Sequence, residues 1–251
     1  MSDANPPAAI EIRALVLPSD PPGATPMDLT VEAGETVGLL GDDQVRLTQI
    51  IRVVGGLERP ASGTVKVFGV DVGAASRQTL LQLRRTIGYV SVAGGLLSNM
   101  TVRDNVALAL HYFQDEDGRG PDSVTERCNE LIALGSLEDV ADQPASVVPA
   151  EYQKCAAYVR ALGRNPKLLL VEDPAAFLHP DGRSTIARLH AKVRGTGITI
   201  LLADDDVGLA QRLVERALWL TGDTISYDGP SATLPRELAP SGRTMLPFDI
   251  R

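Results

Sequence analysis

Aromatic side chains are scarce in this sequence, since Phe, Trp and Tyr make up only 4% of its 251 residues. Proteins that bind single-stranded nucleic acid stack bases on such rings, and duplex-binding proteins present a basic surface. Here 32 acidic residues outnumber 24 Lys and Arg residues, which gives a formal net charge of −8. The composition therefore argues against nucleic acid as a partner.

Cysteine, histidine and long apolar runs are also lacking. The two cysteines, Cys128 and Cys155, are too few for a disulfide framework, and no Cys/His spacing typical of a zinc site occurs. No apolar run approaches the roughly 20 residues that a membrane span needs. Residues 1–7 have neither the basic region nor the apolar stretch of a signal peptide. We therefore expect a cytoplasmic protein without a bound metal.

Strand-like and helix-like segments alternate along much of the chain. The apolar runs 36–40, 167–171 and 198–202 are too continuous for strands with one solvent-exposed face. They predict a parallel sheet covered by helices on both sides, which is an α/β fold. Helical segments between about 100 and 165 interrupt the alternation and predict a separate lobe.

Residues 41–48 match the frame of a phosphate-binding loop but lack its chemistry. The pattern is G-x-x-x-x-G-K-[ST] between a buried strand and a helix. Gly41 and Thr48 fit, whereas Arg46 stands at the second glycine and Leu47 at the lysine. The lysine places a cation on the phosphates, and the glycines let backbone N–H groups approach them. We expect residues 41–48 to join the strand to a helix over 48–56. Arg46 should point into the phosphate space or pair there with a nearby carboxylate.

Five longer segments extend this comparison: 37–41, 56–63, 87–90, 99–106 and 160–170. In these segments the chain resembles the nucleotide-binding subunits of ABC transporters, over almost its whole length. It is most similar to the ATPases of MCE/Mla-type lipid transporters, on residues 105–112, 137–142 and the ending Gly242, Leu246, Pro247 and Phe248.

The resemblance implies one cassette domain over residues 1–251 with a P-loop core and a mostly parallel sheet. It adds an antiparallel β-subdomain at the N-terminus, a helical subdomain near 93–165 and a C-terminal tail near 238–251. A short cytoplasmic helix of a membrane permease is expected to dock beside Leu96, Leu97 and Met100.

The family's ATP-binding positions carry other residues here. Val92 replaces a glutamine that senses the γ-phosphate, and Asp205 stands at the switch histidine. The signature Leu-Ser-Gly-Gly-Gln aligns with Val148, Pro149, Ala150, Glu151 and Tyr152. Pro149 has no N–H to donate, and Glu151 places a negative charge where a phosphate should lie.

The catalytic carboxylates and the base-stacking ring are altered as well. The family's Asp-Glu pair is inverted to Glu172-Asp173, so the shorter carboxylate would lie about one methylene from the water that it should orient. His179 replaces the aspartate of the next loop, and an aromatic near residues 17–20 to stack on adenine is absent.

Together these replacements predict a pseudo-ATPase, a non-catalytic scaffold or regulator of a membrane transporter, with lipid as the implied substrate. One lost charge contact typically costs about 3 kcal/mol of transition-state stabilisation, so hydrolysis is expected to be negligible. Binding of the family cofactor MgATP is not expected either, because Leu47 replaces the lysine and Asp42 and Asp43 add negative charge. The alternatives are a weakly active ATP-hydrolysing subunit, half of an asymmetric ATPase pair, and a regulator that has left the transporter. The implied partners are an integral membrane permease and a paralogous cassette or second copy, at the inner face of the cytoplasmic membrane.

Seven carboxylates are expected at the carboxyl edge of the sheet, opposed only by Arg46: Asp42, Asp43, Glu172, Asp173, Asp204, Asp205 and Asp206. They predict either a site for a divalent cation or basic segment, or solvated loop ends, which we favour. We expect His190 at the surface, Tyr152 and Tyr158 in packing, and residues 115–117 in a solvated loop.

Overall fold

The computed structural model describes residues 8–113, 120–235 and 238. The chain divides into two compact units, one of residues 1–74 with 201–251 and the other of residues 75–200. The acidic run 115–117 and the ending 242–248 lie outside the described residues, as does all but residue 238 of the expected tail. In the described ranges, no helix combines the length and the hydropathy that crossing a membrane requires.

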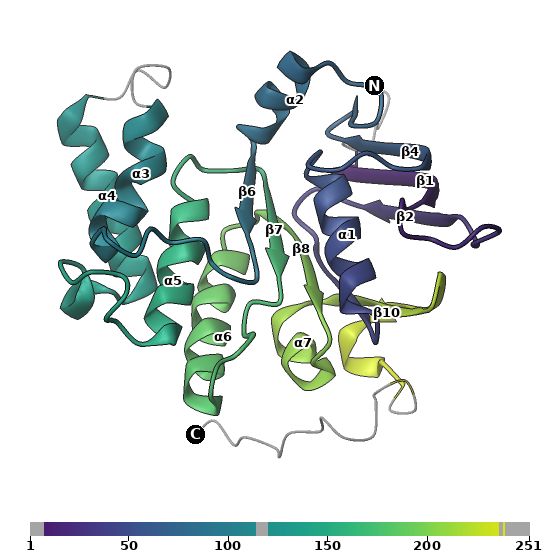
Figure 1. Cartoon of the computed structure of the whole chain (residues 1–251). Helices are drawn as coiled ribbons and strands as arrows, with labels where there is room; N and C mark the ends of the chain where they lie inside the picture. The colour runs from purple at the N-terminus through teal and green to yellow at the C-terminus, as the bar shows by residue number, and fades with distance from the viewer. Residues whose placement is uncertain (1–7, 114–119, 236–237, 239–251) are drawn as a thin grey trace, which may run out of the picture. The chain divides into compact units, whose positions relative to one another are not determined.

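The first unit contains a small antiparallel sheet (Figure 1). Its strand order is β2-β1-β4-β5, with β1 (Ile10–Val16), β2 (Met27–Val31), β4 (Ser62–Val67) and β5 (Val70–Asp71). The register of β1 shifts after Ile12, where Ala14 has a φ of 48°. A Cβ at Gly63 would lie 2.2 Å from the Ala14 carbonyl oxygen, so the irregular strand requires a glycine beside it. This sheet confirms the predicted antiparallel subdomain.

The same unit carries a second sheet whose strands β10, β9, β3 and β8 are neighbours in that order. Strand β3 (Thr36–Gly41) is parallel to β9 (Arg216–Thr221), and β10 (Thr224–Pro230) is antiparallel to β9. The boundary between the two units falls within strand β8 (Thr199–Asp204), which belongs to the first unit from residue 201 onward. Every residue of β3 and β8 is buried, as their continuous apolar runs predict. Helices α1 (Gln44–Val54) and α7 (Val207–Leu213) and the short η2 (Ser231–Thr233) complete the unit.

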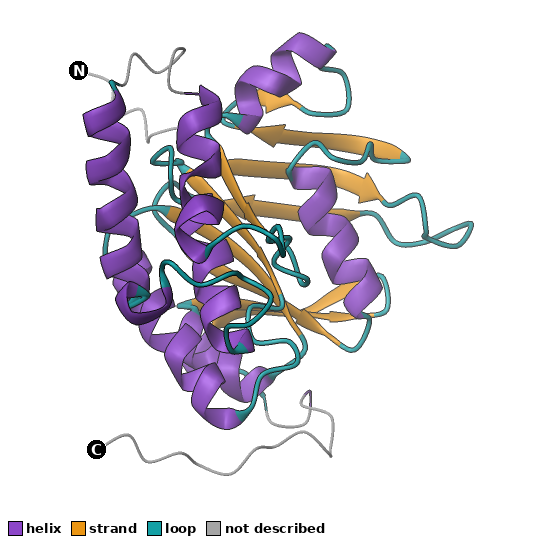
Figure 2. Ribbon diagram, turned by 60° about the vertical axis from the view of Figure 1, so that its left-hand side comes forward, coloured by secondary structure: helices purple, strands orange, loops and turns teal. Residues whose placement is uncertain are grey.

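The second unit is mainly helical (Figures 1 and 2). It contains α2 (Arg77–Arg84), β6 (Ile87–Val90), α3 (Val102–Phe113), α4 (Pro121–Gly135), η1 (Glu138–Val140), α5 (Ala150–Ala161), β7 (Leu168–Glu172) and α6 (Pro180–Arg194). Helices α3, α4 and α5 pack on one another, and β6 pairs in parallel with β7. A Cβ at Gly88 would lie 2.6 Å from the Ala161 carbonyl oxygen, so this glycine allows β6 to approach the end of α5.

A buried asparagine fixes the turn before α3. The Oδ1 of Asn105 accepts from the Leu97 N–H at 2.7 Å, and its Nδ2 donates to the carbonyls of Leu97 and Thr101 at 3.0 and 2.9 Å. The Thr101 hydroxyl accepts from the Asp104 N–H at 3.0 Å and so caps the start of α3. Leu97 remains 46% exposed on this turn, whereas Leu96 and Met100 are half-buried.

His190 corrects one expectation, because it is fully buried rather than at the surface. It follows Ile186 by one helical turn on α6, and that face is buried through Ile186, Leu189 and Val193. The hydroxyl of Tyr158, itself buried on α5 as expected, lies 2.6 Å from His190 Nδ1. The two rings meet edge to face, with their centroids 6.0 Å apart. The pair gives two buried polar groups a shared hydrogen bond.

We expect Tyr158→Phe to lower the free energy of unfolding by about 1–3 kcal/mol, because His190 Nδ1 loses this partner inside the core. Urea denaturation measures the loss. The control is Tyr152→Phe on the same helix, where a half-buried ring is expected to change stability by less than about 0.5 kcal/mol. Equal stability of the two variants would contradict a role for the buried hydrogen bond.

Candidate nucleotide site

The segment that matches the phosphate-binding loop is folded as the start of a helix. Strand β3 ends at Gly41, and only Asp42 and Asp43 precede the first residue of α1, Gln44. The expected loop over residues 41–48, with its helix beginning at Thr48, is therefore wrong, because the helix begins a full turn earlier. Thr48 instead lies inside α1 and is half-buried.

The early helix start has a local cause. The Asp43 carboxylate caps α1 by accepting from the Arg46 N–H at 3.0 Å, and its carbonyl accepts from the Leu47 N–H, also at 3.0 Å. Arginine at the second glycine position favours the helix, because glycine costs about 1 kcal/mol there. The capping carboxylate consequently lies at the helix N-terminus, which is where a phosphate would bind.

The Arg46 side chain forms a buried ion pair. Its Nη1 donates to Asp20 Oδ1, and the two side chains are only 7% and 1% exposed. The other oxygen of Asp20 accepts from the Leu17 N–H at 2.8 Å. Burial lowers the pKa of the Arg46 guanidinium, while the charge of Asp223 opposes this shift. Arg46 therefore pairs with a carboxylate, but Asp20 is not one of the seven that we expected to face it.

Asp20 was not identified from the sequence. It lies in the proline-rich segment between β1 and β2, close to where the family resemblance implies an adenine-stacking aromatic ring. No local pattern marks it, because its partner is distant in the chain.

Leu47, at the lysine position, is fully buried. It belongs to the apolar face of α1 with Ile50, Ile51 and Val54. A side chain at this position points into the core in the observed helix, so it is not available to contact phosphate.

Two more of the seven predicted carboxylates, Asp204 and Asp206, accept hydrogen bonds from backbone N–H groups. Asp204 is buried, and its Oδ1 accepts from the Asp206 N–H at 2.8 Å. Asp206 caps α7 through the Leu209 N–H at 3.0 Å. Asp42 is exposed, and Asp205 is half-buried. Within the described ranges, no group of three or more His, Cys, Asp or Glu is arranged to hold a metal ion.

The second unit holds Glu172, at the end of β7, with its own side chains and backbone. Glu172 is buried, and it accepts hydrogen bonds from the Tyr89 hydroxyl and, at 3.3 Å, from the Val92 N–H. The buried ammonium of Lys154 on α5 donates to the carbonyl of Val92 and, at 3.4 Å, to that of Asp173. Both backbone polar groups of Val92, its N–H and its carbonyl, are thus hydrogen-bonded to buried charged side chains. Tyr89 belongs to the family segment 87–90, but nothing in that segment indicates a contact with Glu172, and Lys154 lies in none of the five family segments.

The segment aligned with the signature begins α5. Pro149 is the N-cap residue, Ala150 is the first helical residue, and Glu151 lies in the first turn. The Val148 carbonyl accepts from the Gln153 side chain at 2.9 Å. Tyr152, in the same first turn, is half-buried. The proline therefore occupies a position where its missing N–H costs the helix nothing.

Comparison with known proteins agrees with this arrangement of elements. Residues 24–176 match the ABC transporter family. The methionine import ATP-binding protein MetN of Cereibacter sphaeroides is 36% identical over 205 residues, which cover 81% of this chain and 57% of that protein. The phosphonates import ATP-binding protein PhnC 2 of a Synechococcus species is 28% identical over 85% of this chain and 80% of its own length.

Solved structures agree on the fold. A dimeric, post-hydrolysis structure of the ATP-binding cassette MJ0796 with ADP and Pi has a TM-score of 0.78 at 21% identity, over 88% of this chain and 98% of that chain. The chain spans only 57–64% of the length of three methionine import relatives that it matches. Its sequence and its fold show that the chain belongs to the ABC transporter ATPase family.

Proposed function

We propose that the protein is a non-hydrolysing subunit of an ABC transporter and acts as its scaffold or regulator. One observation carries the proposal: the phosphate-binding segment is occupied by the protein itself. The Asp43 carboxylate caps the N-terminus of α1, where a phosphate would bind, and Arg46 forms an ion pair with Asp20. A phosphate would have to displace a carboxylate and compete with its negative charge.

The second unit gives separate support. The Glu172 carboxylate already accepts two hydrogen bonds, from Tyr89 and Val92. A general base must have an oxygen within reach of the water that it activates. Val92 offers no side-chain ligand for Mg²⁺, and Pro149 offers no backbone donor to a phosphate.

The second candidate function is ATP hydrolysis, alone or as half of an asymmetric pair. The names of the relatives favour it, because MetN and PhnC 2 are described as ATP-binding proteins of import systems. Under this alternative the first turn of α1 would have to open before a nucleotide binds.

The proposed partners are a membrane permease and either a second copy or a paralogous cassette, with the protein at the inner face of the cytoplasmic membrane. The exposed Leu97, with Leu96 and Met100, is our proposed contact for the permease. Methionine and phosphonate importers are among the relatives, so we place import of a small solute ahead of the lipid substrate that residues 105–112 and 137–142 imply. Helices α3, α4 and α5 would form the helical subdomain.

We expect no rise in melting temperature with millimolar MgATP, because the nucleotide is not expected to bind. A ligand that binds the native state stabilises it, and at about 100 times Kd the gain is about 2.7 kcal/mol. Thermal unfolding with and without MgATP measures this. The MetN protein of Cereibacter sphaeroides, treated identically, is the positive control. A clear shift for this chain would overturn the proposal and favour the alternative.

A further inference from the structure

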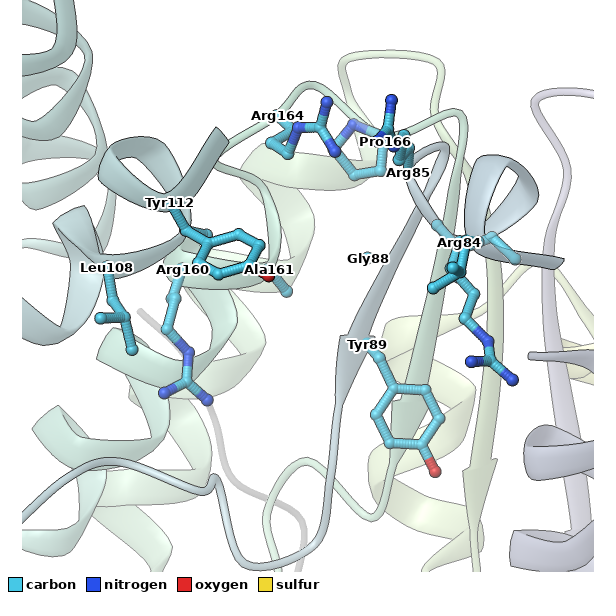
Figure 3. A pocket seen from close by; sticks show the side chains of 13 residues that line it. Arg84, Arg85, Gly88, Tyr89, Leu108, Tyr112, Arg160, Ala161, Arg164 and Pro166 are labelled. Carbon is cyan, nitrogen blue, oxygen red and sulfur yellow. The ribbon is translucent and has the colours of Figure 1, made fainter. Parts of the chain in front are cut away.

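Arg160 of α5 binds the backbone of the segment that follows β6. Figure 3 shows this arginine across from Tyr89, at the wall of a pocket of about 780 Å³. Its Nη2 and Nη1 donate to the carbonyls of Gly94 and Gly95 at 2.7 and 2.8 Å. Both glycines have positive φ, 71° and 62°, a conformation that other residues rarely adopt. One guanidinium thus fixes two carbonyls of an unusual turn.

Lys154, on the same helix, binds this segment and also the end of β7. The residue is only 8% exposed, and its ammonium donates to the carbonyl of Val92 and, at 3.4 Å, to that of Asp173. A buried ammonium is costly unless its N–H groups are hydrogen-bonded, so the two carbonyls make this position possible. Lys154 therefore joins two stretches of backbone that are distant in sequence.

The Glu172 carboxylate lies on the other side of the Val92 peptide groups. It accepts from the Val92 N–H at 3.3 Å and from the Tyr89 hydroxyl. Val92 thus has a buried anion on its N–H and the buried cation of Lys154 on its carbonyl. Charges in a protein interior are tolerated when hydrogen bonds satisfy them, and the backbone of Val92 supplies one bond to each charge.

The backbone of Asp173 adds an independent observation. Its φ is 34°, a positive value that few residues other than glycine adopt. Its carbonyl accepts from the Ala176 N–H at 3.1 Å as well as from Lys154. Such conformations persist only where the surrounding structure holds them, and they occur preferentially at functional sites. Lys154 is one of the groups that hold this one.

We propose that Lys154 is a built-in cation that fixes residues 92–95 to the end of β7, so that this segment keeps one conformation without a ligand. Val92 and Asp173 stand where the family resemblance implies the γ-phosphate sensor and the catalytic carboxylate. The ammonium that binds both carbonyls repels a second cation, so Mg²⁺ does not fit beside Glu172. The inference rests on the proposed function for the absence of a bound nucleotide. Lys154 acts as a positioning residue.

The first test is Lys154→Met in the full chain, which removes the ammonium and nearly keeps the length of the side chain. The carbonyls of Val92 and Asp173 then lose this donor. We expect amide hydrogen exchange in residues 91–97 and 173–176 to become at least about tenfold faster, because these segments open more readily. Equal exchange in the variant and the unaltered chain would overturn the proposal.

Two control variants separate this local effect from a general loss of stability. Lys192→Met removes an exposed ammonium that donates to the Leu134 carbonyl, also at 3.4 Å, and should leave exchange in residues 91–97 unchanged. Tyr158→Phe destabilises α5 without removing a contact of that segment. If Tyr158→Phe accelerates the segment as much as Lys154→Met, the lysine has only a structural role and the proposal fails. Should Lys154→Met not fold, Lys154→Gln, whose amide is shorter, takes its place with the same expectation.

Magnesium chloride without nucleotide tests the exclusion of a second cation. Exchange in residues 91–97 of the unaltered chain should be the same with and without millimolar Mg²⁺. Slower exchange with Mg²⁺ would show that a divalent cation binds this segment, and would overturn the proposal. The MgATP melting test is independent: a thermal shift there, with the local effect of Lys154→Met intact, removes only the proposed function. No thermal shift, with no local effect, removes only this inference.

Discussion

Replacing Leu47 by Lys is expected to lower the free energy of unfolding by about 4 kcal/mol, since a buried ammonium without a partner is strongly destabilising. Leu47 has no exposed surface and lies on the apolar face of α1. In an open phosphate-binding loop, a lysine here would instead reach the ligand. Urea denaturation with and without MgATP therefore distinguishes the two structures.

The control for this substitution is Leu47→Met, which nearly conserves volume and should cost less than about 1.5 kcal/mol. A Leu47→Lys protein as stable as the Met variant, with a thermal shift in MgATP, would contradict both the buried position of residue 47 and the proposed loss of nucleotide binding.

Asp20→Asn is expected to cost about 3 kcal/mol or more, because it leaves the Arg46 charge buried without its counter-charge. The amide oxygen still accepts from the Leu17 N–H, so the substitution changes mainly the ion pair. Asp42→Asn removes an exposed carboxylate beside α1 and should change stability by less than about 0.5 kcal/mol.

A double-mutant cycle isolates the pair. Asp20→Asn combined with Arg46→Met should recover most of the loss, because an apolar side chain replaces the uncompensated cation. If the double variant is as unstable as the sum of the two single variants, Arg46 and Asp20 do not act as a pair.

The fully buried strands could be predicted from the sequence because each is marked by a run of consecutive apolar residues. The run 36–40 corresponds to β3, and the run 167–171 corresponds to β7 with a shift of one residue. The start of α1 was predicted wrongly, because the family pattern favoured a loop over the local evidence. Asp43 followed by helix-forming residues is itself a cap signal.

The contacts of the candidate site could not be predicted in the same way. Arg46 of α1 pairs with Asp20 from the loop between β1 and β2, and Lys154 donates to the carbonyls of Val92 and Asp173. Such pairs depend on how distant segments pack, and one sequence has no periodicity that encodes them. His190 differs, since its position one turn after Ile186 already indicates a buried face.

The early start of α1 makes the phosphate-binding sequence difficult to introduce at residues 46 and 47 one substitution at a time. Arg46→Gly alone would leave the buried carboxylate of Asp20 without its ion-pair partner. A lysine at position 47 alone would place an ammonium group in the core. Each substitution alone is therefore expected to be destabilising, and because the two positions are neighbours their effects need not add. The stability of the helix thus favours keeping Arg46 and Leu47 together.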